Sequence, residues 1–213
     1  MSFVEYPDRA AWLAGRKSGV GASEAAAAIG LSPSKSPLTL WKEKTGRQAE
    51  EDLSENERVE YGTLAEEHIR ALFTLQRKNE YDVKYHAYRI YAHDEFPFLT
   101  CTLDGELIDR ETAERGVWEC KTAWISSRAD LDEWRDRIPN KYYIQVLYQM
   151  FVTGRSFAVL TAQLIFRDGN SEIKNYTIRA DECADDTAYI IDGVKDFWRY
   201  VEGDKQPPTM ISL

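Results

Sequence analysis

The hydrophobic pattern changes its period in the middle of the chain, and this change constrains the fold more than any other feature. From Glu55 to Lys78 the apolar residues recur at helical spacing, and they are Leu64, Ile69, Leu72, Phe73 and Leu75. Residues 82–92, 96–105 and 115–123 are instead rich in β-branched and aromatic residues and are separated by Pro, Gly and charged turns. The pattern therefore predicts one long helix followed by three successive strands.

Capping residues and punctuation predict the remaining elements. Ser23 is placed to cap a short helix that Gly30 would end, and Ser36 and Gly46 repeat this arrangement around a second helix. The predicted helices are residues 23–30, 36–46, 140–154 and about 181–201, and the further strands are residues 156–166 and 171–178. The order helix, three strands, helix, strand predicts an α+β fold with one mixed sheet, formed as a single domain over residues 1–213.

Charge and cysteine usage exclude several classes of protein. The net charge of −9 argues against a protein that binds nucleic acid non-specifically over its whole surface. A groove lined with basic residues could still exist in a protein whose outer surface is acidic. Three widely spaced cysteines with no CxxC pair indicate neither a disulfide framework nor a zinc site. The chain also lacks a stretch of about 20 apolar residues and the pattern of a signal peptide. These features lead us to expect a soluble, cytoplasmic protein without a membrane span.

Two charged residues interrupt an apolar strand in the stretch GVWECKTA, residues 116–123. Side chains alternate along a strand, so Glu119 and Lys121 share one face and Trp118 and Cys120 share the other. The preceding predicted strand ends at Asp104. If these two strands are neighbours, Asp104 lies beside Glu119 and Lys121 at the edge of the sheet.

This combination of charges suits a divalent cation. Two carboxylates about 4 Å apart repel each other by roughly 4 kcal/mol at an effective dielectric constant near 20. Mg²⁺ would relieve that repulsion with Asp104, Glu119 and a backbone carbonyl such as that of Cys120 as ligands, while Lys121 stabilises charge on a phosphate. These residues predict phosphodiester hydrolysis, and a cross-strand salt bridge on a solvated sheet face stays open as the alternative.

Two helices could complete such a site. Glu66 borders the apolar side of the long predicted helix and could lean over the sheet edge, or it could simply pair with Arg70 one turn later. Lys141, Gln145 and Gln149 form a polar row at i, i+4 and i+8 on the helix 140–154. Any surface helix can show such a row, so it does not identify a site by itself.

Four separated motifs resemble one known family. They are RKSGVGASEAAAAIGLSPSKSPLTLWKEKTG, YGTLAEEH, CTLDGEL with WECKT, and YYIQVLYQMFVTG. Together they resemble the lambda-exonuclease-like (YqaJ-type) phage recombinases of the PD-(D/E)XK nuclease superfamily, whose core is a central mixed sheet flanked by helices in the order αβββαβ. The resemblance implies that Asp104 and Glu119 bind the metal and that Lys121 is the catalytic lysine. It also implies that Glu66 completes the acidic cluster and that Gln145 orients the site.

The resemblance also implies how DNA is held. Arg16 and Ser23 match positions that recognise the 5′-phosphate of a DNA end in this family, and a helix start with an arginine suits an anion. Thr102 stands where relatives often carry a serine that helps to hold phosphate. Leu147 stands where they often carry a second glutamine. Outside these motifs, Trp124 and Arg128 are candidates for lining a DNA channel.

The resulting prediction is a Mg²⁺-dependent 5′ to 3′ exonuclease, with Mn²⁺ as a plausible substitute, that acts on double-stranded DNA ends. It would leave a 3′ overhang for recombination by single-strand annealing. The family implies a ring-shaped homotrimer, a partner protein that anneals single-stranded DNA, and a phage or prophage origin in a bacterial host. Two alternatives stay open, namely a PD-(D/E)XK endonuclease and a non-catalytic DNA-binding module with the same fold.

Overall fold

The computed structural model describes residues 1–53 and 55–208, and it contains two β-sheets. The larger sheet has five strands in the order β2 (Tyr81–Lys84), β5 (Gly105–Asp109), β6 (Arg115–Ile125), β7 (Phe157–Phe166) and β8 (Ser171–Arg179). Strands β6 and β7 are parallel and the other neighbours are antiparallel, so the sheet is mixed as predicted. The smaller sheet consists of β1 (Ser2–Glu5), β3 (Arg89–Ala92) and β4 (Thr100–Cys101).

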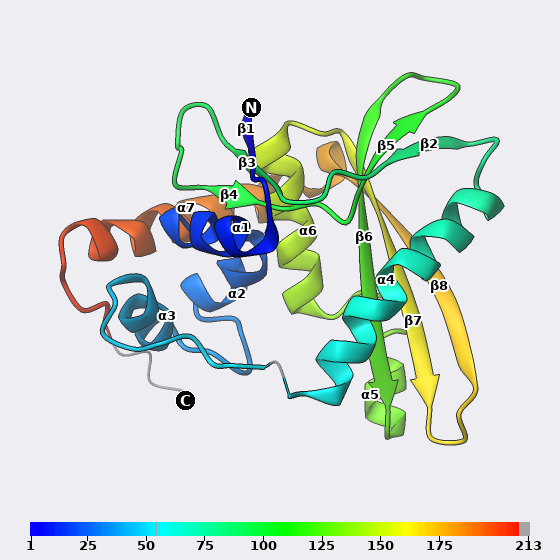
Figure 1. Cartoon of the computed structure of the whole chain (residues 1–213), viewed down its shortest axis with the longest axis horizontal. Coiled ribbons are helices and arrows are strands. Elements are labelled where there is room, and N and C mark those ends of the chain that lie inside the picture. Colours follow the sequence, from blue (N-terminus) through cyan, green and yellow to red (C-terminus); the bar gives the residue numbers. More distant parts are fainter. Residues whose placement is uncertain (54, 209–213) are drawn as a thin grey trace.

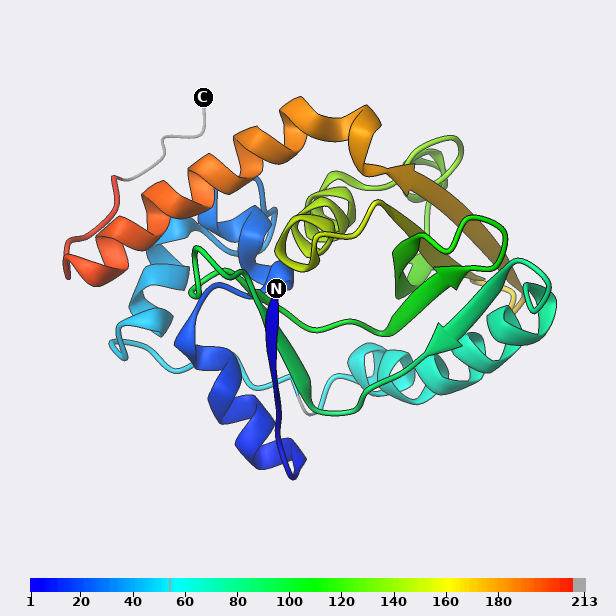
Figure 2. The same cartoon turned by 90° about the horizontal axis from the view of Figure 1, so that it is seen from above.

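Helices cover both faces of the five-stranded sheet. Helix α4 (Glu57–Gln76) lies on one face and α6 (Asn140–Thr153) on the other, with α7 (Ala184–Glu202) beyond α6 (Figures 1 and 2). The short helices are α1 (Arg9–Gly15), α2 (Ala25–Ala28), α3 (Pro37–Lys44) and α5 (Arg128–Asp132), with 3₁₀ turns η1 (Arg16–Ser18), η2 (Ala22–Glu24) and η3 (Ala180–Cys183). For the larger sheet and the two helices on its faces, the chain order α4, β2, β5, β6, α6, β7 confirms the predicted α+β arrangement. The prediction of a single sheet was wrong, because β3 and β4 belong to the smaller sheet.

Strand β6 is the middle strand of the larger sheet and shows the predicted alternation. Trp118 and Cys120 pack with Phe73 of α4 in one buried cluster, whereas Val117 packs in the larger cluster that includes α6. Burial of both faces explains why the stretch is almost continuously apolar. Glu119, which follows Trp118, is therefore directed to the side of α6.

The prediction for the apolar side of α4 was partly wrong. Ile69 and Phe73 are buried, but Leu64, Leu72 and Leu75 are exposed to solvent. The buried residues Ile69 and Phe73 are four positions apart, so only a narrow row along α4 packs against the sheet. Helical spacing alone did not show how wide the covered row would be.

Two of the three predicted strands were also placed incorrectly. Residues 82–92 form β2 and β3 in different sheets, separated by a turn in which Tyr88 has a φ of +58°. Residues 96–105 contain only the two-residue strand β4, and Gly105 begins β5 instead of ending a strand. Turns with a positive φ are usually marked in a sequence by Gly or Asn, because this conformation is costly for a bulky residue. Tyr88 is neither, so the sequence did not indicate the turn.

The residues that begin and end the short helices agree only in part with the predictions. Gly30 and Gly46 follow α2 and α3 with φ of +74° and +72°, as predicted for residues that end helices. Ser36 caps α3 by accepting a hydrogen bond from the Thr39 N–H, but Ser23 lies inside η2 and Gly21 is the capping residue. Among the described residues, no helix combines the length and apolarity needed to cross a bilayer.

Candidate active site

Glu119 is a buried carboxylate at the centre of a network of donors. Its side chain is on β6 and the residue is only 1% exposed. Lys121 Nζ and Gln145 Nε2 each lie 2.5 Å from Oε1, and Gln149 Nε2 lies 2.6 Å from Oε2. Ionised donors and acceptors form the stronger hydrogen bonds in proteins, so this network fixes the orientation of the carboxylate.

Asp104 meets Glu119 as predicted, although the local structure differs from the prediction. Asp104 directly precedes β5, and the antiparallel register that pairs Gly105 with Trp118 brings Asp104 next to Glu119. Its Oδ2 accepts a hydrogen bond of 2.9 Å from the Cys120 N–H. Since the N–H and C=O of one strand residue point to the same neighbouring strand, the Cys120 carbonyl also faces the Asp104 side.

Glu66 approaches the same point from α4. Its Oε1 pairs with Arg70 Nη1 at 2.9 Å, and the same nitrogen donates to the Asp104 carbonyl at 3.0 Å. Glu66 therefore forms the ordinary ion pair with Arg70 one turn later and also lies over the edge of the sheet, so both predicted alternatives are present. Arg70 connects the helix carboxylate to the backbone of the strand carboxylate.

Burial and the neighbouring carboxylates raise the pKa of both carboxyl groups. Burial is the largest cause for Asp104, and the charges of Glu119 and Glu66 add to it, so its pKa lies well above the usual range. Burial also raises the pKa of Glu66, against the opposing effect of Arg70. For Lys121, burial lowers the pKa, but Glu119 and Asp104 raise it more, so the ammonium stays charged.

The donor set fits a hard divalent cation. Asp104 and Glu119 offer carboxylate oxygens, and the Cys120 carbonyl faces them. A cation would offset both the burial of charge and the repulsion that raise the pKa of Asp104. Within residues 1–53 and 55–208, no group of three or more His, Cys, Asp or Glu side chains is arranged to hold a metal ion. The third carboxylate, Glu66, faces Arg70 instead. A cation here would therefore rely on two carboxylates, backbone oxygen and water.

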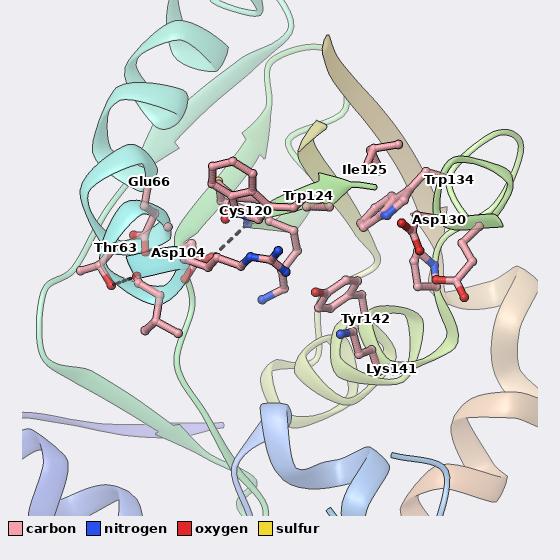
Figure 3. A pocket seen from close by; sticks show the side chains of 18 residues that line it. Thr63, Glu66, Asp104, Cys120, Trp124, Ile125, Asp130, Trp134, Lys141 and Tyr142 are labelled. Atoms are coloured by element: carbon pink, nitrogen blue, oxygen red, sulfur yellow. Dashed lines mark hydrogen bonds between the residues drawn. The ribbon is translucent and has the colours of Figure 1, made fainter. Parts of the chain in front are cut away.

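Two cavities meet at this cluster, and both are lined by Asp104 and Lys121. The larger, of about 590 Å³, lies between α4, β6 and the start of α6. Figure 3 shows Glu66 and Asp104 on one side of it, and Trp134 and Tyr142 on the other. The smaller, of about 200 Å³, lies toward the N-terminal segment.

The smaller cavity contains the three residues that the resemblance assigned to phosphate. Arg16, Ser23 and Thr102 all line it. Ser23 does not begin the helix, so the predicted role of a helix start is wrong, and its side chain is exposed. Glu24 and Glu50 also line this cavity and make it less favourable for an anion.

The two candidates for the DNA channel have different positions. Trp124 lines the larger cavity and is 38% exposed. Arg128 lies outside the set of described residues that line either cavity, and its exposed side chain is 3.9 Å from Asp132 one turn later on α5. The structure thus brings Trp124, but not Arg128, to the site.

Gln149 is the site residue that the sequence prediction missed. It is 1% exposed, and its Nε2 donates both to Glu119 and to the Thr102 carbonyl at 3.0 Å. Leu147, where relatives were expected to carry a second glutamine, is fully buried in the core. The signal for Gln149 was its place in the polar row four residues after Gln145.

Comparisons with known proteins agree with the fold and identify the family. The YqaJ-like viral recombinase domain family matches residues 11–156. The uncharacterized protein YqaJ of Bacillus subtilis strain 168 is 31% identical over 193 residues, which is 88% of this chain and 54% of that protein. The chain therefore spans about half the length of this curated relative.

Solved structures show the same fold at low sequence identity. The alkaline exonuclease LHK-Exo of Laribacter hongkongensis superposes with a TM-score of 0.68 at 20% identity, covering 92% of this chain and 94% of that one. Its complex with dAMP gives 0.69 at 19% identity with the same coverage. A phage-related exonuclease from Haemophilus somnus 129PT gives 0.55 at 15% identity, over 87% of this chain and 96% of that one. With its own sequence matched over residues 11–156, the chain belongs to the YqaJ-like viral recombinase domain family.

Proposed function

We propose that this chain is a metal-dependent exonuclease that degrades one strand of linear double-stranded DNA from a 5′-phosphorylated end and leaves a 3′ overhang. The observation that supports this most directly is the meeting of Asp104, Glu119 and Lys121 at the junction of two cavities. A phosphodiester placed at that junction would have one nucleotide in each cavity. Exonucleases with the same fold, and a dAMP complex of one of them, are consistent with a nucleic-acid substrate.

Mg²⁺, or Mn²⁺ in its place, would be held by Asp104, Glu119 and the Cys120 carbonyl, with Glu66 as a further ligand if it leaves Arg70. When bound, such an ion lowers the pKa of a water ligand and neutralises charge on the phosphate. Gln145 and Gln149 would keep Glu119 oriented toward the ion through their hydrogen bonds. Lys121, already charged, would stabilise the negative charge that develops on the phosphate.

The smaller cavity would anchor the 5′-phosphate through Arg16, with Ser23 and Thr102 beside it. An anchored terminal phosphate places the first phosphodiester at the carboxylates, which is how an exonuclease measures one nucleotide from an end. The family resemblance adds a ring-shaped homotrimer, a partner that anneals single-stranded DNA, and a phage or prophage origin in a bacterial cytoplasm. These three points are part of the proposal.

One observation favours an endonuclease as the second candidate. Glu24 and Glu50 line the smaller cavity together with Arg16, so the cavity does not have the strongly basic lining that would demand a terminal phosphate. An endonuclease would leave that cavity to an internal stretch of the strand. A non-catalytic DNA-binding module is disfavoured by the complete set of Asp104, Glu119 and Lys121.

The decisive substrates are a linear duplex with 5′-phosphate ends, the same duplex with 5′-hydroxyl ends, and a covalently closed circle. The proposal predicts release of mononucleotides from the phosphorylated duplex, slower release from the hydroxyl form and no cleavage of the circle. Cleavage of the circle at a comparable rate would support the endonuclease. Absence of cleavage of all three in Mg²⁺ and in Mn²⁺ would support the non-catalytic module.

A further inference from the structure

The larger cavity has two chemically different ends. One end carries the charged groups Glu66, Asp104 and Lys121. Aromatic side chains line the rest of the cavity: Trp134 after α5 and Tyr142 of α6 lie on the side away from Glu66, whereas Trp124 of β6 lies beside Cys120 on the α4 side (Figure 3). A volume of about 590 Å³ lies within the roughly 300–1,000 Å³ typical of small-molecule sites.

Trp124 differs from Trp134 because it is held in place by neighbours on α4 and is still partly exposed to solvent. Tyr61 of α4 packs against its ring edge-on, with centroids 5.7 Å apart, and the Arg58 guanidinium lies 5.7 Å from its centroid. Tyr61 is itself tethered by a hydrogen bond of 3.1 Å to Gln163. Despite these contacts Trp124 is 38% exposed, whereas Trp134 is 3% exposed.

Positive charge lies beside the aromatic residues on both sides of the larger cavity. The ammonium groups of Lys121 and Lys141 lie 5.3 Å and 4.6 Å from the centroid of the Tyr142 ring. A sugar phosphate that extends from Asp104 toward Trp124 would start beside Lys121 and approach Arg58, which lies over the Trp124 ring. A fixed and partly exposed aromatic ring at the end of such a path is the arrangement that stacks a base, and it is tolerant of sequence because every base has a π-face.

We propose that Trp124 is the stacking surface for a nucleobase, namely the base of the nucleotide whose 5′-phosphate lies at the carboxylate cluster. Tyr61 and Arg58 position the Trp124 ring for this contact. The inference rests on the proposed function in taking a nucleotide chain as the substrate. The inference adds that the larger cavity holds the nucleotide on the 3′ side of the cleaved bond, while the terminal nucleotide lies in the smaller cavity.

Two small ligands test the proposal without any cleavage. Calorimetric titration in Mg²⁺ compares dAMP with deoxyribose 5-phosphate, which has the same sugar phosphate and no base. Every protein in this comparison carries Arg16→Ala, which removes the proposed phosphate anchor of the smaller cavity and leaves the ligand phosphate to the carboxylate cluster, and the protein with no other change serves as the wild type. The wild type is expected to bind dAMP more tightly. Trp124→Ala is expected to weaken dAMP binding by about 5- to 150-fold and to leave deoxyribose 5-phosphate unchanged, in line with the usual contribution of one stacked base.

Two further variants separate stacking from a structural effect. Trp124→Phe keeps a stacking face and is expected to retain most of the dAMP affinity. Tyr189→Ala removes an exposed aromatic residue on α7, outside both cavities, and is expected to bind both ligands like the wild type. Equal affinity of the wild type for the two ligands, a failure to bind either, or an equal loss for both ligands in Trp124→Ala would overturn the proposal.

The outcomes also distinguish this inference from the proposed nuclease activity. A wild type that cleaves DNA but binds dAMP independently of Trp124 overturns the stacking surface and leaves the nuclease. A wild type that cleaves no DNA but binds dAMP through Trp124 overturns the nuclease and supports a nucleotide-binding site.

Discussion

At the scale of single residues, the strand period was a better guide than the helix period. Glu119 and Lys121 were predicted to share a face, and they do, because alternation leaves a strand residue only two directions. Gln149 could not be separated from a solvated residue, since a polar row at i, i+4 and i+8 is common on exposed helices. Its importance depends on burial and on the Thr102 carbonyl, which come from tertiary packing.

The raised pKa of Asp104 leads to a prediction about stability without metal. A carboxyl group whose pKa is higher in the folded state gives stability that is full below its unfolded pKa, about 3.9, and that is lost as pH rises through the folded pKa. Asp104→Asn removes this charge, and its side-chain oxygen can still accept from the Cys120 N–H. In EDTA, the melting temperature of Asp104→Asn should therefore exceed that of the wild type by an amount that increases from pH 4 to pH 8.

Asp109 at the other end of β5 provides a control of opposite sign. Hydrogen bonds from the backbone N–H groups of Thr112 and Glu111 lower its pKa, so Asp109→Asn should destabilise the protein at pH 8. Thermal unfolding of the three proteins in EDTA measures both effects. Equal melting temperatures of Asp104→Asn and the wild type at pH 8 would contradict the repulsion described for this cluster.

Gln149 provides a second prediction at this scale. Gln149→Met keeps the volume but removes the donor to Glu119 and Thr102, and hydrogen bonds to charged groups contribute about 1.5–3 kcal/mol. The free energy of unfolding in urea should fall by about that amount, and cleavage should slow. Gln145→Met is the matched control and should cost less, because Lys121 still pairs with the same Glu119 oxygen and Gln145 is half-buried. An equal or larger cost for Gln145→Met would be evidence against the role given to Gln149.

At the scale of elements, helices were predicted well and short strands were not. Residues 96–105 have the composition of a strand, but Phe98 stacks on Trp198 of α7 with centroids 5.2 Å apart instead of joining the sheet. The true strand β5 starts just after Asp104, so the acid is placed by the register of β5 on β6. Aromatic composition reports burial, and it does not report whether the burial is in a sheet or against a helix.

The close packing of α4 on β6 leads to a prediction about Gly62. A Cβ at Gly62 would lie 3.0 Å from Thr122 Oγ1, so Gly62→Ala must move the helix or the threonine by a few tenths of an ångström. Because Glu66 lies one turn later on the same helix, we expect a loss of cleavage rate, up to about 100-fold. The double variant Gly62→Ala with Thr122→Ala removes the contact and should recover the rate. A double variant as slow as Gly62→Ala alone would contradict a steric origin.

At the scale of the whole molecule, the order of the long elements was predictable and the second sheet was not. The sequence pattern identified α4, β6, α6, β7 and α7 because each has enough residues to show a period. The strands β1, β3 and β4 have four, four and two residues, which is too few for alternation to be recognised. This small sheet nevertheless contributes Thr100 and Cys101 to the cavity that holds Arg16.

The proposed ring leads to a prediction about mass. The chain has a mass of 24.5 kDa and a net charge of −9, so a ring could direct its few cavity-lining cations inward while acidic residues face solvent. Sedimentation equilibrium should give about three times the chain mass at working concentration. A single species at the chain mass would remove the trimer from the proposal and would leave the site unchanged.

The central claim is that Asp104, Glu119 and Lys121 form one metal-dependent site for cutting DNA, and the most direct measurement is the rate of cleavage of a 5′-phosphorylated linear duplex as Mg²⁺ is titrated. The wild type should be inactive in EDTA and should saturate with Mg²⁺. Lys121→Ala should be at least about 100-fold slower at saturating Mg²⁺, while Lys78→Ala, an exposed residue beyond the end of α4, should match the wild type. Cleavage by the wild type that persists in EDTA, or a Lys121→Ala variant as fast as the wild type, would contradict the account.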